Sequence, residues 1–334
     1  SQDYIIEKFT TIILSYVMHY FNRKITIKPN LTNLQKSCKM PLVPHYKKEY
    51  TMGNIAIMTD TNSGITPKFA ADNDIFLMKM PFFVDGYQYL EYDNIKTEDF
   101  YKKLGEGADV STSQPSPGAL TNMWDKILKT YDSLVYLPMS SGLSGTYSTA
   151  FALAADYEGK VFVVNNRRIS VTLYESVSDA LRLRDYGMSA AEIAETLEKE
   201  GSNSSIYVAV NTLQYLKKSG RVTPAGAAIG SLLGIKPVLT IQGGKLDAYK
   251  KVRGMSSAME AMLAGIENDI KTRFPYMDVH IRAAYSGDIS VGRQWQKAVK
   301  EHFKDYEIGL DALPISIACH VGAGALGIGV AKTL

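Results

Sequence analysis

The stretch SLVYLPMSSGLSGTYSTAFALAADYEGKVFVVNN, Ser133 to Asn166, decides the fold. SLVYLPM is a short apolar run typical of a buried strand, GTYSTAFALAADY is typical of a helix, and KVFVVNN predicts a second strand. A strand, a helix and a strand in succession favour parallel pairing, because the helix carries the chain back across the sheet. The connection between the first strand and the helix, MSSGLSGT, is crowded with serine and glycine.

The same rhythm extends upstream and downstream of this stretch. NIAIMTD (54–60) predicts a buried strand followed by a turn, TNSGITP, and DIFLMKMPFFV (74–84) is a second strand candidate. Ser116 and Pro117 are an N-cap and a first-turn proline for a helix in SPGALTNMWDKILKTY. Ser189 and Glu192 form a capping box for another helix, which Gly201 ends. We therefore predict an α/β fold with a parallel sheet covered by helices on both faces.

The pattern changes after about residue 205. The strand candidates are SIYVAV, KPVLTI, KLDAYKKV, MDVHIRAAYS and ISIACH, and the helix candidates are AMEAMLAGIENDIKTRF and RQWQKAVKEHF. Gly243 and Gly244 lie between two of these strands, which predicts a hairpin and antiparallel pairing. The expected organisation is an N-terminal extension (1–52), a parallel α/β domain (53–205) and a second α/β domain with a largely antiparallel sheet (206–334).

Bulk composition excludes several classes of function. The net charge of +3 is small, and basic residues are not interleaved with aromatic ones, so nucleic acid is not expected as a partner. Cys38 and Cys319 lie far apart and form no CxxC pair, which predicts neither a disulfide framework nor a zinc site and fits a reducing cytoplasm. Residues 4–20 have apolar side chains at helical spacing but are too short and too polar to span a bilayer. We expect an amphipathic helix that packs on the protein or a partner, with attachment to a membrane surface as the alternative.

Two glycine-rich motifs resemble known catalytic or cofactor motifs without satisfying them. Gly322, Gly324 and Gly327 match GxGxxG, but too few residues follow to complete a dinucleotide-binding βαβ unit. SGLSG is one residue short of the GxSxG nucleophile elbow, and no phosphate loop is present. No cofactor is therefore expected, and Ser144 as the nucleophile of a hydrolase remains an alternative.

Two hydroxyl-rich loops precede predicted helices. Ser144 and Gly145 precede one helix, and Thr112 and Ser113 precede another. Ser144 is either a helix cap or part of an anion site, since the free N–H groups of a helix start favour negative charge. We expect both loops at the carboxyl ends of adjacent parallel strands, where open α/β sheets bind ligands. Neutral donors suit a single carboxylate better than a polyphosphate.

Three further residues are candidates on weaker grounds. His320 stands at the entrance of the C-terminal glycine-rich motif and is either a ligand-facing residue or a core histidine bonded to the backbone. Arg221 and Arg253 lie in the basic segments YLKKSGRV and YKKVRGMSSAM, which are either solvated faces or a patch for an acidic partner or a phosphate-bearing reactant.

Six segments together resemble the DegV family of fatty-acid-binding proteins over about residues 53–334. In order they are IAIMTDTNSGIT, STSQPSPG, SSGLSGTYSTA, LQYLKKSGRVTPAGAAIGSLLGIKPVLTIQGGKL, KKVRG and HVGAGALGIG. The resemblance implies two α/β domains that bury a long-chain fatty acid. It implies that Thr112, Ser113, Ser144, Gly145 and His320 hold the carboxylate, and that Arg221 and Arg253 face a partner.

The partner that the resemblance implies is the catalytic subunit of a bacterial fatty acid kinase. The carrier would present the carboxylate for phosphorylation by ATP on the other protein and have no ATP site of its own. Burying an acyl tail of about 16 carbons gains about 0.8 kcal/mol for each CH₂ group, whereas a buried carboxylate requires donors. A lipid-sequestering protein without a kinase remains a further alternative.

Overall fold

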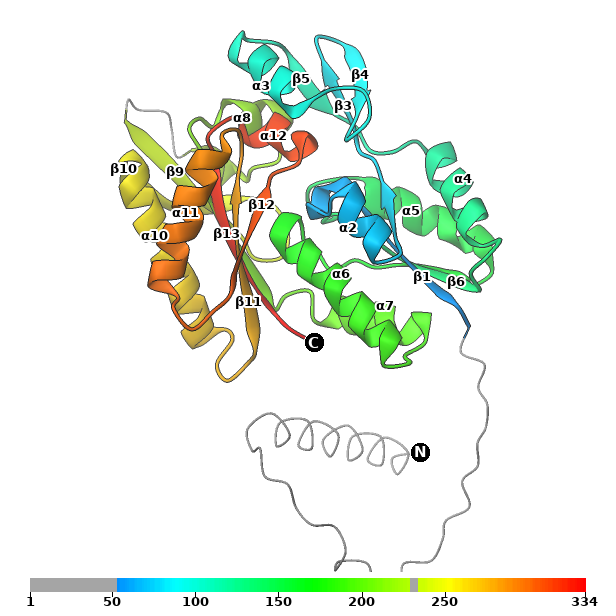
Figure 1. Ribbon diagram of the computed structural model, residues 1–334. Coiled ribbons are helices and arrows are strands. Elements are labelled where there is room, and N and C mark those ends of the chain that lie inside the picture. Colours follow the sequence, from blue (N-terminus) through cyan, green and yellow to red (C-terminus); the bar gives the residue numbers. More distant parts are fainter. Residues whose placement is uncertain (1–52, 229–233) are drawn as a thin grey trace, which may run out of the picture. The chain divides into compact units, whose positions relative to one another are not determined.

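The computed structural model describes residues 53–228 and 234–334, which belong to one compact unit (Figure 1). The predicted helix within residues 4–20 and Cys38 lie outside the described residues. The described chain contains a parallel sheet, a larger and mostly antiparallel sheet, and a small three-stranded sheet. The predicted fold class is confirmed, while the domain boundary at residue 205 stays a prediction.

The parallel sheet has the strand order β2-β1-β6-β7. Its strands are β1 (Ile55–Asp60), β2 (Ile75–Met78), β6 (Ser133–Leu137) and β7 (Val161–Val163). The chain passes from β1 to β2 on one side and later returns to β6 on the other side of β1. The neighbouring carboxyl ends of β1 and β6 therefore form a topological switch point, which is where α/β sheets bind ligands.

Helices cover both faces of the parallel sheet because its strands are buried on both sides. In β1, Ile55 and Ile57 pack on one face and Ala56 and Met58 on the other. The first face is covered by α2 (Pro67–Asp72), α6 (Ser170–Asp185) and α7 (Ala190–Lys199), and the second by α4 (Pro117–Ile127) and α5 (Thr146–Ala154). The predicted caps are present: Ser116 Oγ accepts the Ala119 N–H, and Ser189 and Glu192 form a capping box.

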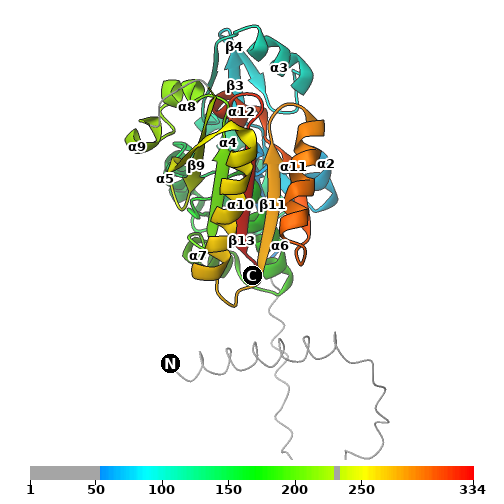
Figure 2. The ribbon, with the colours of Figure 1, turned by 90° about the vertical axis from the view of Figure 1, so that its left-hand side faces the viewer.

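The larger sheet has the strand order β10-β9-β8-β13-β11-β12, and only the β11–β12 pair is parallel. Its strands are β8 (Ser204–Ala209), β9 (Ile235–Ile241), β10 (Asp247–Arg253), β11 (Val279–Tyr285), β12 (Ile308–Ala312) and β13 (Leu326–Lys332). Helices α10 (Gly254–Thr272) and α11 (Ile289–His302) cover its outer face (Figure 2). Its inner face turns towards α6, which lies between the two larger sheets (Figure 1). The predicted β9–β10 hairpin at Gly243 and Gly244 is confirmed.

The three-stranded sheet was not predicted. The apolar run DIFLMKMPFFV, expected as a single strand, divides into β2 and β3, which belong to different sheets. Antiparallel β3 (Pro81–Val84) lies between β4 (Tyr87–Leu90) and β5 (Val110–Thr112), and α3 (Thr97–Gly105) connects β4 to β5. Pro81 at the start of β3 allows this division, since a proline cannot donate to a sheet ladder.

The prediction for ISIACH was also wrong. This segment forms the helix α12 (Ile315–Val321), which follows β12 and precedes β13. Its apolar side chains Ile315, Ala318 and Cys319 pack at helical spacing against Phe82 and Val110 of the three-stranded sheet. A short apolar run fits either a strand or a buried helix, and tertiary packing decided here. The short helices α8 (Gln214–Ser219) and α9 (Pro224–Ala227) precede β9.

Candidate functional site

A cavity of about 300 Å³ lies at the switch point of the parallel sheet. The turn after β1 and the long loop after β6 contribute Asn62 and Met139 to its wall, and the inner face of the six-stranded sheet closes the opposite side. The loop after β6 also packs on the β9–β10 hairpin. Gly142 lies so close to Gly244 that a Cβ on Gly142 would be 2.8 Å from the Gly244 carbonyl carbon. This loop therefore joins the two larger sheets beside the cavity.

Most of the cavity wall is apolar. The strands of the six-stranded sheet alternate, so that Ile206 and Val208 face the cavity while Tyr207 and Ala209 pack under α10 and α11. Aliphatic side chains from both halves of the described chain complete this wall: Leu143, Ile169, Val171, Leu216, Ile241, Leu246, Ala284, Leu313, Ile317 and Val321. Such a surface accepts a hydrocarbon chain and offers no specific polar contact to it.

Thr112 and His320 meet at the polar end of the cavity. Thr112 Oγ1 and His320 Nε2 are 2.9 Å apart and share a hydrogen bond, and both residues line the cavity. His320 Nδ1 is buried and has no hydrogen-bond partner among the described residues. Burial, together with the positive charge of Arg221, lowers the pKa of His320 to about 4. The imidazole is therefore neutral at physiological pH in the free protein.

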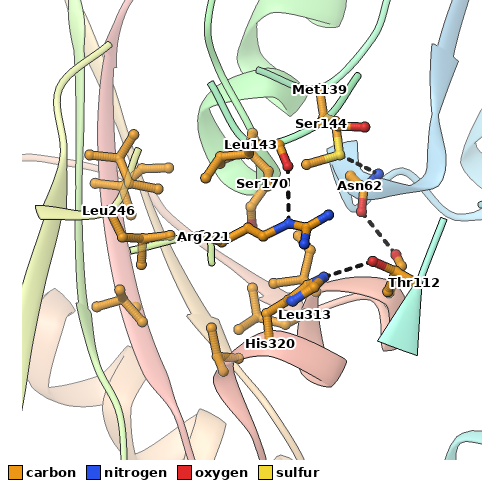
Figure 3. Close-up of a pocket in the computed structure, with 18 of the residues that line it drawn as sticks. Asn62, Thr112, Met139, Leu143, Ser144, Ser170, Arg221, Leu246, Leu313 and His320 are labelled. Atoms are coloured by element: carbon orange, nitrogen blue, oxygen red, sulfur yellow. Dashed lines mark hydrogen bonds between the residues drawn. The ribbon is translucent and has the colours of Figure 1, made fainter. Parts of the chain in front are cut away.

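Arg221 extends into the same space. Figure 3 shows its guanidinium group between Leu143 and His320, and its Nε donates to the Leu143 carbonyl oxygen at 3.4 Å. Another guanidinium nitrogen donates to the carbonyl oxygen of Ser219. Carbonyl groups do not neutralise a guanidinium, so the charge of Arg221 is available to an anion in the cavity. Arg253, by contrast, is exposed at the end of β10 and does not line the cavity.

Ser144 and Gly145 lie at the start of α5 and also line the cavity. Ser144 Oγ accepts the Thr146 N–H at 3.2 Å and shares a second hydrogen bond with the Thr146 hydroxyl at 2.9 Å. The predicted capping contact with a first-turn N–H is thus present, although Gly145 occupies the N-cap position. The Ser144 hydroxyl is paired with Thr146, and His320 with Thr112, so the free protein has no serine–histidine pair at this site.

The loop after Thr112 closes the cavity beside α5. Ser113 lines the cavity, but its hydroxyl donates to the neighbouring Gln114 carbonyl oxygen at 3.2 Å. Gln114 Nε2 donates to Thr149 Oγ1 on α5 at 2.9 Å. A Cβ on Gly145 would be 2.6 Å from Gln114 Oε1, so a larger residue at 145 would displace this side chain.

Sequence reasoning missed a polar bridge through Asn62. Asn62 Oδ1 accepts the Ser316 hydroxyl at 2.9 Å, and Asn62 Nδ2 donates to Met139 Sδ at 3.0 Å (Figure 3). The fully buried Asp60 carboxylate holds this turn by accepting the N–H groups of Asn62 and Met139. Burial raises the pKa of Asp60 to about 6. The position of the polar turn TNSG directly after a buried strand was the signal that could have indicated Asn62.

The two hydroxyl loops converge on the cavity by a different route from the one predicted. Ser144 follows β6 of the parallel sheet, as expected, but Thr112 ends β5, which belongs to the antiparallel three-stranded sheet. The expectation that both loops follow adjacent parallel strands was therefore wrong. All five residues predicted for the carboxylate line the cavity, and Arg221, predicted to face a partner, lines it as well.

Neither a metal site nor a membrane span stands out in the part of the chain that the structure describes. Within residues 53–228 and 234–334, His, Cys, Asp and Glu side chains form no group of three that could hold a metal ion. The helices of the same ranges include none with the length and hydropathy needed to cross a membrane.

A family model for uncharacterised proteins of the DegV family matches residues 54–333. The chain belongs to the DegV family. This DegV protein is 28% identical over 283 residues to a DegV domain-containing protein of Staphylococcus aureus (strain N315), covering 83% of this chain and 98% of the relative. It is 29% identical over 282 residues to a DegV domain-containing protein of Deinococcus radiodurans, covering 82% of this chain and 97% of the relative.

Solved structures of the family share the fold. A DegV family protein from Thermus thermophilus, described for its fatty acid binding, superposes with a TM-score of 0.76 at 27% identity, covering 84% of this chain and 99% of that one. DegV from Bacillus subtilis, described as a fatty acid binding protein, gives a TM-score of 0.74 at 23% identity, covering 84% and 100%. At 23% identity, the likeness to the Bacillus subtilis protein concerns the fold alone.

Proposed function

We propose that this DegV protein binds a long-chain fatty acid in the cavity and presents its carboxylate to a separate ATP-dependent kinase, which forms an acyl phosphate. The observation that carries the binding proposal is the composition of the cavity wall. A long aliphatic surface ends at Arg221, Thr112 and His320, where a cation, a hydroxyl and an imidazole converge. The fatty acid binding described for the Thermus thermophilus relative supports the same ligand class.

The carboxylate would be held by charge and by oriented hydroxyl groups. Arg221 supplies the positive charge that a buried carboxylate requires. If His320 Nε2–H donates to Thr112 Oγ1, the hydroxyl proton of Thr112 is directed away from the imidazole and is available to the ligand. The buried Nδ1 favours this arrangement, because a neutral imidazole carries a single N–H and Nδ1 has no acceptor for it among the described residues. Ser144 and the free N–H groups at the start of α5 offer further donors.

The apolar wall accounts for retention of the acyl chain. Each CH₂ group transferred from water to this wall contributes about 0.8 kcal/mol, so a chain of about 16 carbons is retained without a covalent bond. Ala284 lies in this wall. A larger residue there would shorten the space available and favour shorter chains.

The kinase step is supported by sequence features outside the cavity. The chain contains no phosphate loop, which agrees with ATP being held on another protein. Arg253 is exposed and separate from the cavity lining, which suits a contact with a partner. Arg253→Gln is expected to reduce acyl-phosphate formation in a mixture with the kinase and ATP while leaving fatty acid binding unchanged. Unchanged acyl-phosphate formation in this variant would remove Arg253 from the proposal. If the unmodified protein gives no acyl phosphate with any candidate kinase, a lipid-sequestering protein is favoured instead.

Native mass spectrometry of gently purified protein tests the binding proposal. We expect a bound mass in the fatty-acid range, and Ala284→Leu should shift the bound population towards shorter chains. A spectrum of ligand-free protein after mild purification, with no uptake of added hexadecanoate, would overturn the proposal. Hydrolysis of an acyl ester that is lost in Ser144→Ala would instead indicate the hydrolase alternative.

A further inference from the structure

Glu91 is a buried carboxylate that does not line the cavity but binds the helix carrying His320. It follows β4 directly and is 2% exposed. Its Oε1 accepts the Ile315 N–H at 2.8 Å, and its Oε2 accepts the Ser316 N–H at 3.0 Å. These are the first two residues of α12, whose N-cap residue, Pro314, provides no side-chain acceptor. Glu91 thus satisfies donors that the helix cannot satisfy itself.

The helix that Glu91 holds contributes four residues to the cavity wall. They are Ser316, Ile317, His320 and Val321. Ser316, whose N–H is bound by Glu91, also donates its hydroxyl to Asn62. His320 lies one turn further along the same helix. Any shift of the start of α12 along its axis is therefore transmitted to the imidazole.

The same small sheet holds both Glu91 and Thr112. Phe82 of β3 pairs with Tyr89 on one side and with Thr112 on the other. The Glu91 N–H donates to the Met80 carbonyl oxygen at 3.2 Å, which joins the residue to the start of β3. The apolar contacts of α12 with this sheet are non-directional, whereas the two hydrogen bonds that Glu91 accepts from the helix fix its position along its axis.

We propose that Glu91 is a positioning residue. It holds α12 at the position along its axis where His320 Nε2 meets Thr112 Oγ1, and it thereby determines the affinity for the ligand carboxylate. The affinity part rests on the proposed function, and the positioning part rests on the hydrogen bonds of the free protein. Glu91 acts through His320 and does not itself touch the ligand.

The test compares Glu91→Gln with Asp269→Asn. Glutamine has the same shape but places an NH₂ group against one of the two backbone donors. Asp269 is also 2% exposed and accepts the Tyr207 hydroxyl at 2.9 Å, far from the cavity on the outer face of the six-stranded sheet. Three quantities are measured for both variants: thermal stability, the dissociation constant for hexadecanoate, and the ¹⁵N chemical shifts and pKa of the His320 ring.

Both variants are expected to lose stability, but only Glu91→Gln should alter the site. We expect its dissociation constant for hexadecanoate to rise about fivefold, its His320 ring signals to shift, and the His320 pKa to move from about 4 towards 6.5. Asp269→Asn should leave the affinity and the ring signals unchanged. Glu91→Asp, which keeps two acceptor oxygens, should restore part of the affinity, and it replaces Glu91→Gln as the test if the glutamine variant does not fold.

Two outcomes separate the failure of this proposal from that of the proposed function. If the unmodified protein binds hexadecanoate and Glu91→Gln changes neither affinity nor the His320 signals, the positioning role is overturned and fatty acid binding stands. If the unmodified protein binds no hexadecanoate, the proposed function fails, and the His320 ring signals of the free protein still decide whether Glu91 positions the imidazole.

Discussion

Thr112 Oγ1 and His320 Nε2 share a hydrogen bond of 2.9 Å although 208 positions separate the two residues in the chain. One residue belongs to the three-stranded sheet and the other to α12, so the contact forms only when these elements pack together. It creates the polar end of a cavity whose remaining wall is mostly aliphatic.

Removing the Thr112 hydroxyl should weaken ligand binding. Thr112→Val keeps the shape and the strand propensity of the side chain but removes the hydroxyl that we propose donates to the ligand carboxylate. We expect the dissociation constant for hexadecanoate to rise about tenfold, measured by calorimetry. Thr121→Val is the control, because the Thr121 hydroxyl donates to the Pro117 carbonyl oxygen within α4. Equal effects of the two variants would contradict the role of Thr112.

Arg221 and Arg253 should have different functions. Arg221→Met keeps much of the apolar stem but removes the charge beside His320, so hexadecanoate affinity should fall about tenfold to a hundredfold. The pKa of His320 should also rise somewhat from about 4, because the charge of Arg221 contributes to lowering it. Burial, the larger cause of the low pKa, remains in the variant. Arg253→Met should change neither quantity, because Arg253 lies outside the cavity. A loss of affinity in Arg253→Met alone would reverse this assignment.

His320 should make stability depend on pH. Between pH 4 and 6.5 the unfolded chain binds a proton on His320 that the folded chain excludes, so this residue makes stability rise with pH. Asp60 acts in the opposite direction, because its folded-state pKa of about 6 lies above its usual 3.8. The two effects offset each other in the unmodified protein. Comparison with His320→Gln isolates the first effect.

The quantity to measure is the free energy of unfolding of both proteins by urea titration, from pH 4 to pH 7. The unmodified protein should gain stability relative to His320→Gln by up to about 3 kcal/mol as the pH rises through this window. A difference that stays constant with pH would show that His320 titrates normally in the folded protein.

Gly142 and Gly118 should respond oppositely to alanine. In Gly142→Ala the new Cβ would be 2.8 Å from the backbone of Gly244, so the loop or the hairpin must move. We expect the free energy of unfolding to fall by about 1–3 kcal/mol and ligand binding to weaken. In Gly118→Ala in α4 the new Cβ has no atom within 4 Å, so the free energy of unfolding should rise by about 0.4–1 kcal/mol. Urea titration of the two variants decides, and a stable Gly142→Ala protein would show that the two segments separate easily.

Local sequence signals were sufficient for much of the fold. The apolar runs of β1, β6 and β7 and the caps at Ser116 and Ser189 specify their elements without distant contacts. They were insufficient where a neighbour decides the structure. Ile315 to Val321 is apolar enough for a strand, but the backbone donors at its start find Glu91, and its side chains fit the three-stranded sheet as a helix.

The site could be predicted only in part for the same reason. The hydroxyl loops and His320 were indicated by motif and resemblance, and the structure places them around one cavity. Ser316 became recognisable only through its contact with Asn62 across 254 positions. Arg221 stands in a basic segment, and composition gives no means of telling a surface cation from one whose stem crosses an apolar wall.

The position of β13 has a consequence for the synthesis of this protein. This strand follows every other strand of its sheet in sequence, yet it lies between β8 and β11 in the middle of that sheet. A nascent chain that has not reached residue 326 holds two separate groups of strands whose facing edges are unpaired. The cavity, whose wall includes Gly327 of β13, therefore closes only after this strand has inserted between the two groups.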